Sequence, residues 1–348
     1  MSSNNLTQVL LRNSDYLSAN AALLVNLPAD SFIDEYQALY PEITLAHFTT
    51  NFEQHQAIAQ NNRQIDNQFG ITFTSEQKFD LIILAFPKTK AEFAFTLHAL
   101  QQNMTEDARI MVVGENKGGV KSVPKLAKEL IKFCNKIDSA RHCSLFSGLR
   151  IVVEQDFNLD DWYKRYSVSV NDIALTVAAL PGVFSQTELD VGTRLLLENL
   201  PETLSGQLLD FGCGAGVIAA FVGKKAEQTG NELTLNLADV SALALHSAEQ
   251  TLAENQLIGT TIATNSLSHI TAKYDCVVSN PPFHQGVKTN YLATETFLGK
   301  IKLNLIKSGK IYVVANSFLR YQPIMEQAIG KTTITAKAKG FTIYQCQS

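Results

Sequence analysis

Short apolar runs alternate with helical patterns along the whole chain. Runs rich in β-branched residues occur in the first half at 23–27, 43–48, 81–86 and 110–113, and in the second half at 207–211, 233–238, 276–279 and 311–315. Helical spacing of apolar residues lies between them, at 93–100, 217–227, 243–255 and 291–306. This alternation predicts buried parallel strands joined by crossover helices, and therefore an α/β fold with doubly wound sheets.

The two halves of the chain resemble each other. FDLIILA at 79–85 aligns with YDCVVSN at 274–280, and RIMVVG at 109–114 aligns with KIYVVA at 310–315. The offsets of 274 − 79 = 195 and 310 − 109 = 201 residues are nearly equal. A duplicated α/β unit explains both matches, whereas the alternative is two unrelated domains that share a generic strand pattern.

The segment between the halves is polar and acidic, and we place the domain boundary near Asp160, between domains 1–160 and 161–348. Apolar and polar residues then alternate around Asn171 and Asp172, which predicts a β-hairpin. Ser185 and Glu188 have the spacing of a capping box, which predicts a helix over 188–200.

Composition supports this picture and excludes several classes of protein. The chain has 348 residues, of which 45% are apolar and 18% charged, as expected of about two globular domains rather than a disordered or coiled-coil protein. Its net charge of −4 argues against coating nucleic acid by bulk charge alone. The five cysteines contain no CxxC pair, which predicts that the protein has no cysteine metal site and resides in the reducing cytoplasm. The sequence has no apolar stretch long enough for a membrane span.

A glycine loop follows the first strand of the second half. Asp210 lies near the end of the strand, and Gly212, Gly214 and Gly216 form the pattern G-x-G-x-G before a helix. Glycines permit positive φ angles and let a ligand approach the bare backbone. The NAD fingerprint would need glycine or alanine where Val217 stands, so the loop favours S-adenosylmethionine (SAM).

Two further residues are candidates for holding this cofactor. Asp239 ends the next strand, where a carboxylate can accept hydrogen bonds from both ribose hydroxyls. Asn265 follows the third strand and is our candidate for the adenine amine, at a position where many SAM enzymes have an acid. The alternative is a glycine-rich turn beside a surface acid.

The tetrapeptide Asn280-Pro281-Pro282-Phe283 follows another apolar strand. Two prolines stiffen the loop and leave its carbonyls free to accept hydrogen bonds. The Asn280 side-chain oxygen and the Pro281 carbonyl would orient an exocyclic amine, and Phe283 would stack on a flipped base. His284 is a candidate for contact with the base or a phosphate. An ordinary proline turn is the alternative.

These motifs resemble the RsmC family of small-subunit ribosomal RNA guanine-N2 methyltransferases. The resemblance rests on the motifs at 210–216 and 280–283, and on LPGVFS at 180–185, LDVG at 189–192, IYVVAN at 311–316, GENKGGV at 114–120 and NKIDSAR at 135–141. It implies tandem Rossmann-like methyltransferase domains, of which only the second binds SAM and reacts. It also implies 16S ribosomal RNA of the small ribosomal subunit as the partner, and we expect a cytoplasmic monomer that needs no metal.

The first half lacks both loops and is expected to be degenerate. Gly70 is its only glycine before residue 110, and Ala85-Phe86-Pro87-Lys88 stands where the tetrapeptide would lie. We expect this half to hold RNA or to support the second domain. Four lysines spaced as on one helix face are candidates for RNA contact: Lys125, Lys128, Lys132 and Lys136. A solvated helix face is the alternative.

Three rival functions remain open. The same chemistry on large-subunit ribosomal RNA fits the tetrapeptide and the duplication. Methylation of a protein glutamine amide is disfavoured because that family usually has tyrosine where Phe283 stands. A non-catalytic RNA-binding assembly protein would bind no SAM.

Overall fold

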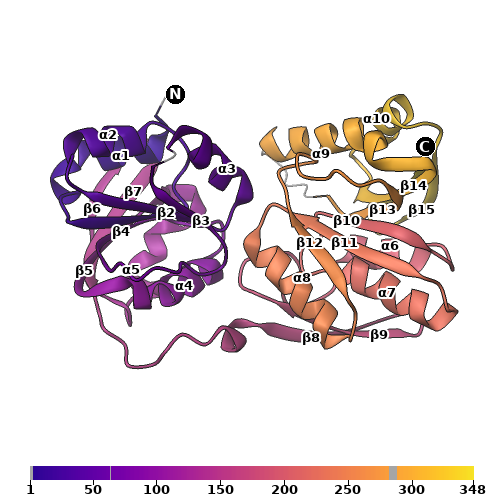
Figure 1. The fold of residues 1–348 in the computed structure, drawn as a ribbon, viewed down its shortest axis with the longest axis horizontal. Helices are drawn as coiled ribbons and strands as arrows, with labels where there is room; N and C mark the ends of the chain where they lie inside the picture. The colour runs from indigo at the N-terminus through magenta and orange to yellow at the C-terminus, as the bar shows by residue number, and fades with distance from the viewer. Residues whose placement is uncertain (1–2, 63, 282–287) are drawn as a thin grey trace. The chain divides into compact units, whose positions relative to one another are not determined.

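The computed structural model describes residues 3–62, 64–281 and 288–348, with the backbone alone described at 288–293. Three candidate residues, Pro282, Phe283 and His284, therefore lie outside the described residues. The chain divides into two compact units, Met1–Trp162 and Tyr163–Ser348 (Figure 1). Among the described residues, no helix has both the length and the apolar character that crossing a membrane requires.

The first unit contains a seven-stranded sheet with the order β3-β2-β1-β4-β5-β7-β6. The first five strands in this order are parallel, and β7 and β6 are antiparallel. The strands are β1 (Ala21–Val25), β2 (Thr44–Thr49), β3 (Asp66–Phe69), β4 (Phe79–Ala85), β5 (Met104–Glu115), β6 (Ile131–Ala140) and β7 (Cys143–Arg150). The helices are α1 (Asn5–Arg12), α2 (Phe32–Leu39), α3 (Phe52–Asn61), α4 (Lys90–Ala99) and α5 (Val123–Leu126).

The second unit contains a sheet of the same topology, β12-β11-β10-β13-β14-β16-β15. Its strands are β10 (Gly206–Phe211), β11 (Leu233–Asp239), β12 (Gly259–Ala263), β13 (Tyr274–Ser279), β14 (Leu305–Asn316), β15 (Thr332–Ala338) and β16 (Phe341–Gln347). Its helices are α6 (Val191–Asn199), α7 (Val217–Thr229), α8 (Ala242–Glu254), α9 (Lys288–Lys300) and α10 (Tyr321–Ala328). The predicted α/β class with doubly wound sheets is confirmed, and the shared strand order is what a duplication predicts.

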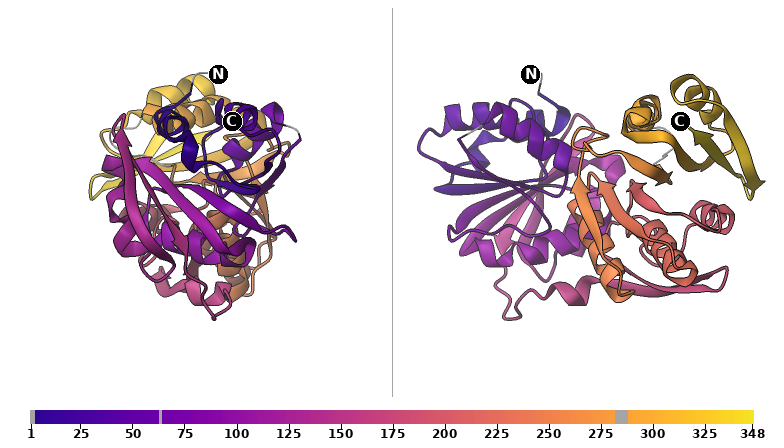
Figure 2. Two further views of the ribbon diagram at one scale, coloured as in Figure 1. Left: turned by 90° about the vertical axis from the view of Figure 1, so that its left-hand side faces the viewer. Right: turned by 45° about the vertical axis from the view of Figure 1, so that its right-hand side comes forward.

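Helices cover both faces of each sheet, so the central strands are buried on both sides (Figure 2). In β1, Leu23 packs into the layer beneath α4, whereas Leu24 packs into the layer beneath α1 and α2. Successive side chains of a strand point to opposite faces. A continuous apolar run is therefore the pattern that such a strand requires, and it is the pattern found in the sequence.

The predicted hairpin is present and is held by a neighbouring helix. Strands β8 (Lys164–Val170) and β9 (Ile173–Ala179) pair across a turn in which Asn171 and Asp172 have φ angles of 45° and 62°. These values suit a two-residue hairpin turn. Ser247 and Thr251 of α8 and its C-cap Asn255 lie one helical turn apart. Their side chains accept hydrogen bonds from backbone amides of β9 and of the residue after it.

The predicted start of the following helix is wrong. Helix α6 begins at Val191, and its N-cap is Asp190, whose carboxylate accepts a hydrogen bond from the Thr193 amide at 2.8 Å. Ser185 instead has a φ of 58° in the preceding loop. The capping-box pattern requires a glutamate or glutamine three residues after the cap. Asp190 caps the helix without one, so the pattern pointed to Ser185 instead.

The predicted basic helix is also wrong. Lys125 lies in the short α5 and Lys128 in the turn after it, whereas Lys132 and Lys136 lie in strand β6. Two irregularities in the pairing of β6 with β7 shift its register. Ile131 and Cys134 pack into one core layer and Ile137 into the other, yet the three are spaced three apart, which imitates helical spacing.

Candidate active site

Three strands of the second unit end side by side at the predicted cofactor and tetrapeptide loops. In the register, Phe211 of β10 pairs with Ala238 of β11 and with Ser279 of β13. The Ser279 hydroxyl also donates a hydrogen bond to the Phe211 carbonyl at 2.7 Å. The strand order reverses at β10, and doubly wound folds bind ligands at this point, beyond the carboxyl ends of the strands.

The glycine loop has the backbone that the sequence predicted. Gly212, Gly214 and Gly216 have φ angles of 70°, 53° and 74°. A Cβ at Gly216 would lie 2.9 Å from Ala248, so this glycine allows α7 to pack closely on α8. A Cβ at Gly214 would meet no described atom within 4 Å. The loop therefore has open space beside Gly214, where a ligand can approach the backbone.

Two carboxylates lie at the loop, and both are shifted toward the protonated form. Asp210 is buried, and its Oδ2 accepts a hydrogen bond from the Ala219 amide at 3.1 Å, while its Oδ1 has no partner among the described residues. Burial, helped by the charge of Asp239, raises the pKa of Asp210 to about 7. Burial likewise raises the pKa of Asp239, whose oxygens accept hydrogen bonds from the Gly214 and Ser241 amides at 3.1 and 2.9 Å.

Asn280 is held in one orientation by two partners. Its Nδ2 donates to Oδ2 of Asp190 at 3.1 Å and to Oγ1 of Thr193 at 2.8 Å. Because a carboxylate only accepts, the amide nitrogen must face Asp190 and the amide oxygen must point away. That oxygen, Oδ1, is buried without a hydrogen-bond partner in the part of the chain that the structure describes. It is an acceptor that an incoming N–H group would satisfy.

Asp190 and Thr193 are functional candidates that our sequence reasoning missed. One oxygen of Asp190 accepts from the Thr193 amide, the Thr193 hydroxyl and the Asn280 amide. Gly192 lets this helix start lie close to β16, since a Cβ there would come within 2.7 Å of the Phe341 ring. The available signal was the spacing of Asp190 and Thr193, which is that of an N-cap and the residue it caps.

The remaining candidates have less defined surroundings. Asn265 is half-buried, two residues beyond the end of β12, in a loop tied to β11 by a 3.0 Å hydrogen bond from the Thr264 amide to the Asp239 carbonyl. Pro281 is buried directly after Asn280. Within the described ranges, no group of three histidine, cysteine, aspartate or glutamate side chains is placed to hold a metal ion.

The described residues of the first unit form no equivalent of this site. Its central strand β1 is followed by Asn26, with a φ of 53°, rather than by a glycine loop. The Asn26 side chain accepts a hydrogen bond from the Thr50 amide at 2.9 Å and so ties the ends of β1 and β2 together. Strand β4, which corresponds to β13, ends at Ala85, a side chain without hydrogen-bonding groups.

Comparisons with known proteins agree with this architecture. Residues 7–166 match the family model described as the methyltransferase small domain N-terminal, and residues 174–345 match the methyltransferase small domain. Ribosomal RNA small subunit methyltransferase C of Colwellia psychrerythraea is 50% identical over all of this chain and 98% of its own. The protein of the same name from Pseudoalteromonas translucida is 41% identical over 98% of each chain.

A solved structure shares the fold over both units. It is the T. thermophilus 16S rRNA N2 G1207 methyltransferase (RsmC) in complex with AdoMet and guanosine. The TM-score is 0.80 at 20% identity, over 96% of this chain and 91% of that chain. The two sheets are thus tandem Rossmann-like methyltransferase domains, and the resemblance found in the sequence is confirmed. Because these relatives match nearly the whole chain, the chain belongs to the ribosomal RNA small subunit methyltransferase C family.

Proposed function

We propose that this chain transfers a methyl group from SAM to the exocyclic N2 amine of a guanine in 16S ribosomal RNA. One observation carries the proposal: Asn280 is held with its nitrogen on Asp190 and Thr193, which leaves its oxygen as an unpaired acceptor. Relatives named as small subunit ribosomal RNA methyltransferases support the substrate. The T. thermophilus protein of the same fold is named for N2 of a guanine, which supports the target atom.

The residues around the glycine loop fit SAM. The unpaired Oδ1 of buried Asp210 favours a ligand that brings positive charge, and the open space at Gly214 gives access to the backbone. Asp239 accepts from the Gly214 amide on one oxygen and from the Ser241 amide on the other, and carboxylate oxygens have further acceptor sites that suit ribose hydroxyls. We assign Asp210, Gly212, Gly214, Gly216 and Asp239 to the cofactor, with Asn265 beside the adenine.

The catalytic work of the chain is positioning. SAM supplies an electrophilic methyl group on a positively charged sulfur. An exocyclic amine on a base ring is a poor nucleophile, because its lone pair is delocalised into the ring. A hydrogen bond from this amine to Asn280 Oδ1, with a second to the Pro281 carbonyl, turns the lone pair toward the methyl group. Alignment of this kind lowers the barrier without a strong base, since the proton becomes acidic once the nitrogen is alkylated.

The other assignments follow from this role. We infer that Pro282 stiffens the loop, that Phe283 stacks on the flipped guanine and that His284 contacts the RNA. Domain 161–348 carries the reaction, and domain 1–160 holds RNA or supports it, with the exposed Lys125, Lys128, Lys132 and Lys136 as phosphate contacts. The reaction uses no metal ion and needs one chain, in the cytoplasm where ribosomal subunits assemble.

The proposal is tested by locating the transferred methyl group. The purified chain is incubated with methyl-labelled SAM and ribosomal RNA from a strain that lacks the corresponding gene, and the nucleosides are analysed by mass spectrometry. We expect N2-methylguanosine in the small-subunit RNA. Label in large-subunit RNA, label in protein, or no transfer would each contradict the assigned substrate.

Gly214 and Gly216 provide a matched pair of variants that separates binding from packing. Gly214→Ala adds a methyl group to open space, so we expect SAM affinity to fall at least about tenfold while the free energy of unfolding falls by about 1–2 kcal/mol, from the positive φ alone. Gly216→Ala places the same methyl group 2.9 Å from Ala248 and should destabilise the chain more. Calorimetric titration and thermal unfolding measure both. Unchanged SAM affinity in Gly214→Ala would refute the assigned binding face.

The raised pKa of Asp210 predicts a pH dependence of cofactor binding. The folded chain keeps a proton on this group up to about pH 7, whereas the unfolded chain loses it near the ordinary aspartate value of 3.8. The contribution of Asp210 to the free energy of unfolding therefore declines as the pH rises between these values. A cationic ligand favours the ionised form, so SAM affinity should increase as the pH rises through 7, with proton release. Titration calorimetry in buffers of different ionisation enthalpy measures this release, and Asp210→Asn should reduce it.

A further inference from the structure

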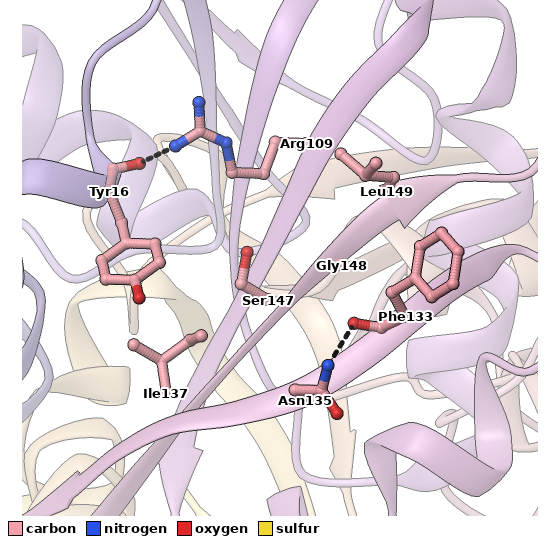
Figure 3. Close-up of a pocket in the computed structure, with 8 residues that line it drawn as sticks. All are labelled: Tyr16, Arg109, Phe133, Asn135, Ile137, Ser147, Gly148 and Leu149. Carbon is pink, nitrogen blue, oxygen red and sulfur yellow. Dashed lines mark hydrogen bonds between the residues drawn. The ribbon is translucent and has the colours of Figure 1, made fainter.

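The antiparallel end of the first sheet has a shallow hollow that the proposed reaction does not use. Its volume is about 330 Å³, and Figure 3 shows its lining on strands β5, β6 and β7 and at Tyr16, which precedes β1. The Phe133 ring lies at one side and the Tyr16 ring at the other, with Gly148 between them and Arg109 beside Tyr16. Phe133 and Tyr16 are 74% and 41% exposed. We call this surface the Phe133 hollow.

A bulge in β6 presents the Phe133 side chain to solvent. Lys132 pairs with Leu149 and Asn135 with Ser147, so one more residue is inserted on β6 than on β7. Phe133 has a φ of 55°, which is rare for a bulky side chain. The Asn135 side chain donates a hydrogen bond from Nδ2 to the Phe133 carbonyl at 3.1 Å. Residues with strained backbone angles cluster at active sites and ligand-binding sites.

Gly148 is required for the bulge. A Cβ at this position would collide with the Ile131 side chain and would lie 2.7 Å from the Lys132 carbonyl oxygen. Glycine therefore allows β6 to fold tightly over β7 at Phe133. Gly148 thus permits the bulge that exposes the Phe133 ring.

Arg109 adds a second flat, fixed group to the hollow. Its Nη1 donates to the Tyr16 carbonyl at 2.7 Å and its Nη2 to the Ser18 carbonyl at 3.3 Å, which holds the plane of the guanidinium. In the register, Arg109 and Lys132 both pair with Leu149, so they lie in one row across three strands. Lys132 does not line the hollow itself, but its register places it in the row of Arg109, next in sequence to Phe133. An aromatic ring and a fixed guanidinium in the hollow suit a base, and a lysine in the adjoining row suits its phosphate.

The stretch of sequence that contains β5, β6 and β7 is rich in positive charge, and one of its basic residues, Arg109, lines the hollow. Residues 109–150 contain nine lysines and arginines and three acids, a local excess of 9 − 3 = +6 on a chain with a net charge of −4. One of the three acids, Asp138, lies 3.4 Å from Arg12 and is paired with it. A partner protein would meet the same charge, but an unpaired nucleotide uses both the charge and the flat surfaces.

We propose that the Phe133 hollow binds an unpaired base of the substrate RNA, stacked on Phe133, with a neighbouring phosphate on Lys132. The inference rests on the proposed function, because it takes RNA as the substrate. It adds a specific contact, far in sequence from Asn280, that acts on RNA affinity rather than on the methyl transfer step.

The test measures binding of a fluorescein-labelled single-stranded RNA of alternating cytosine and adenine to the full chain. Phe133→Ala is expected to weaken binding about tenfold or more, Phe133→Leu nearly as much, and Phe133→Tyr little, since stacking needs a ring. Lys132→Gln should lower the slope of log affinity against log salt by about one, and the Phe133 variants should leave the slope unchanged. Leu39→Ala is the matched control, an exposed apolar residue of the same unit, at 51% exposure, outside the hollow.

Methylation separates this inference from the proposed function. If both hold, Phe133→Ala raises KM for RNA and leaves kcat and SAM affinity unchanged. If the unmodified chain methylates RNA while Phe133→Ala has the same KM and the same RNA affinity, the hollow is not an RNA site. If Phe133→Ala alters self-association in analytical ultracentrifugation without altering RNA affinity, the hollow is a protein interface and the inference is overturned. If the unmodified chain transfers no methyl group, the proposed function fails first.

Discussion

Asn280→Ala is expected to lower kcat for methyl transfer by about a hundredfold or more while SAM affinity stays unchanged. The variant removes the oxygen that orients the amine, and removal of one transition-state acceptor or donor typically costs this much. It leaves the glycine loop, Asp210 and Asp239 intact. Single-turnover kinetics with ribosomal RNA and calorimetric titration with SAM measure the two quantities separately.

Two outcomes would contradict this role of Asn280. An unchanged kcat would show that the amide oxygen does not act on the reacting amine. A parallel loss of SAM affinity and kcat would show that Asn280 supports the cofactor site instead. Ser279→Ala serves as the neighbouring control, because it removes a hydrogen bond between strands rather than the unpaired oxygen.

Asp190→Ala is expected to lower kcat by about tenfold to a hundredfold. The variant removes the carboxylate that holds Asn280 Nδ2, so the amide can rotate and misplace its oxygen, and small misplacements cost this much in rate. Asp190→Asn should restore most of the rate, because its amide oxygen can still accept from Asn280 and from the Thr193 amide. The initial rate at saturating RNA and SAM is the measurement.

The loss of a helix cap is controlled at another helix. Asp190→Ala also removes the N-cap of α6, which costs about 1 kcal/mol of stability. Asn51→Ala removes the N-cap of α3, whose side chain accepts from the Gln54 amide at 3.1 Å. Both variants should unfold at lower temperature, but only Asp190→Ala should react slowly. Equal rates in the two would reduce Asp190 to a structural role.

Strands that are buried on both faces could be predicted from the sequence, because they contain apolar runs. The central strands β1, β4, β10 and β13 each contain an apolar run, and all four overlap the predicted segments. The edge strand β3 was missed. Strand β3, with the sequence DNQF, is polar and half-exposed, so no apolar run marks it.

The glycine loop could be predicted, because residue type determines its backbone. The partners of Asn280 were missed, because they depend on tertiary contacts. The positive φ angles at Gly212, Gly214 and Gly216 follow from residue type, and the sequence predicted this loop. The partners of Asn280 could not be predicted, because Asp190 lies 90 residues away and meets it only through packing of α6. The orientation of the Asn280 amide is therefore information that the structure adds.

The central claim is tested most directly by a crystal structure of this chain with guanosine and the demethylated cofactor, S-adenosylhomocysteine. The account predicts that the guanine N2 lies within hydrogen-bond distance of Asn280 Oδ1, about 2.7–3.2 Å, with Nδ2 still on Asp190 and Thr193. A guanine whose N2 is bound elsewhere, or an Asn280 that turns its nitrogen toward the base, would contradict it.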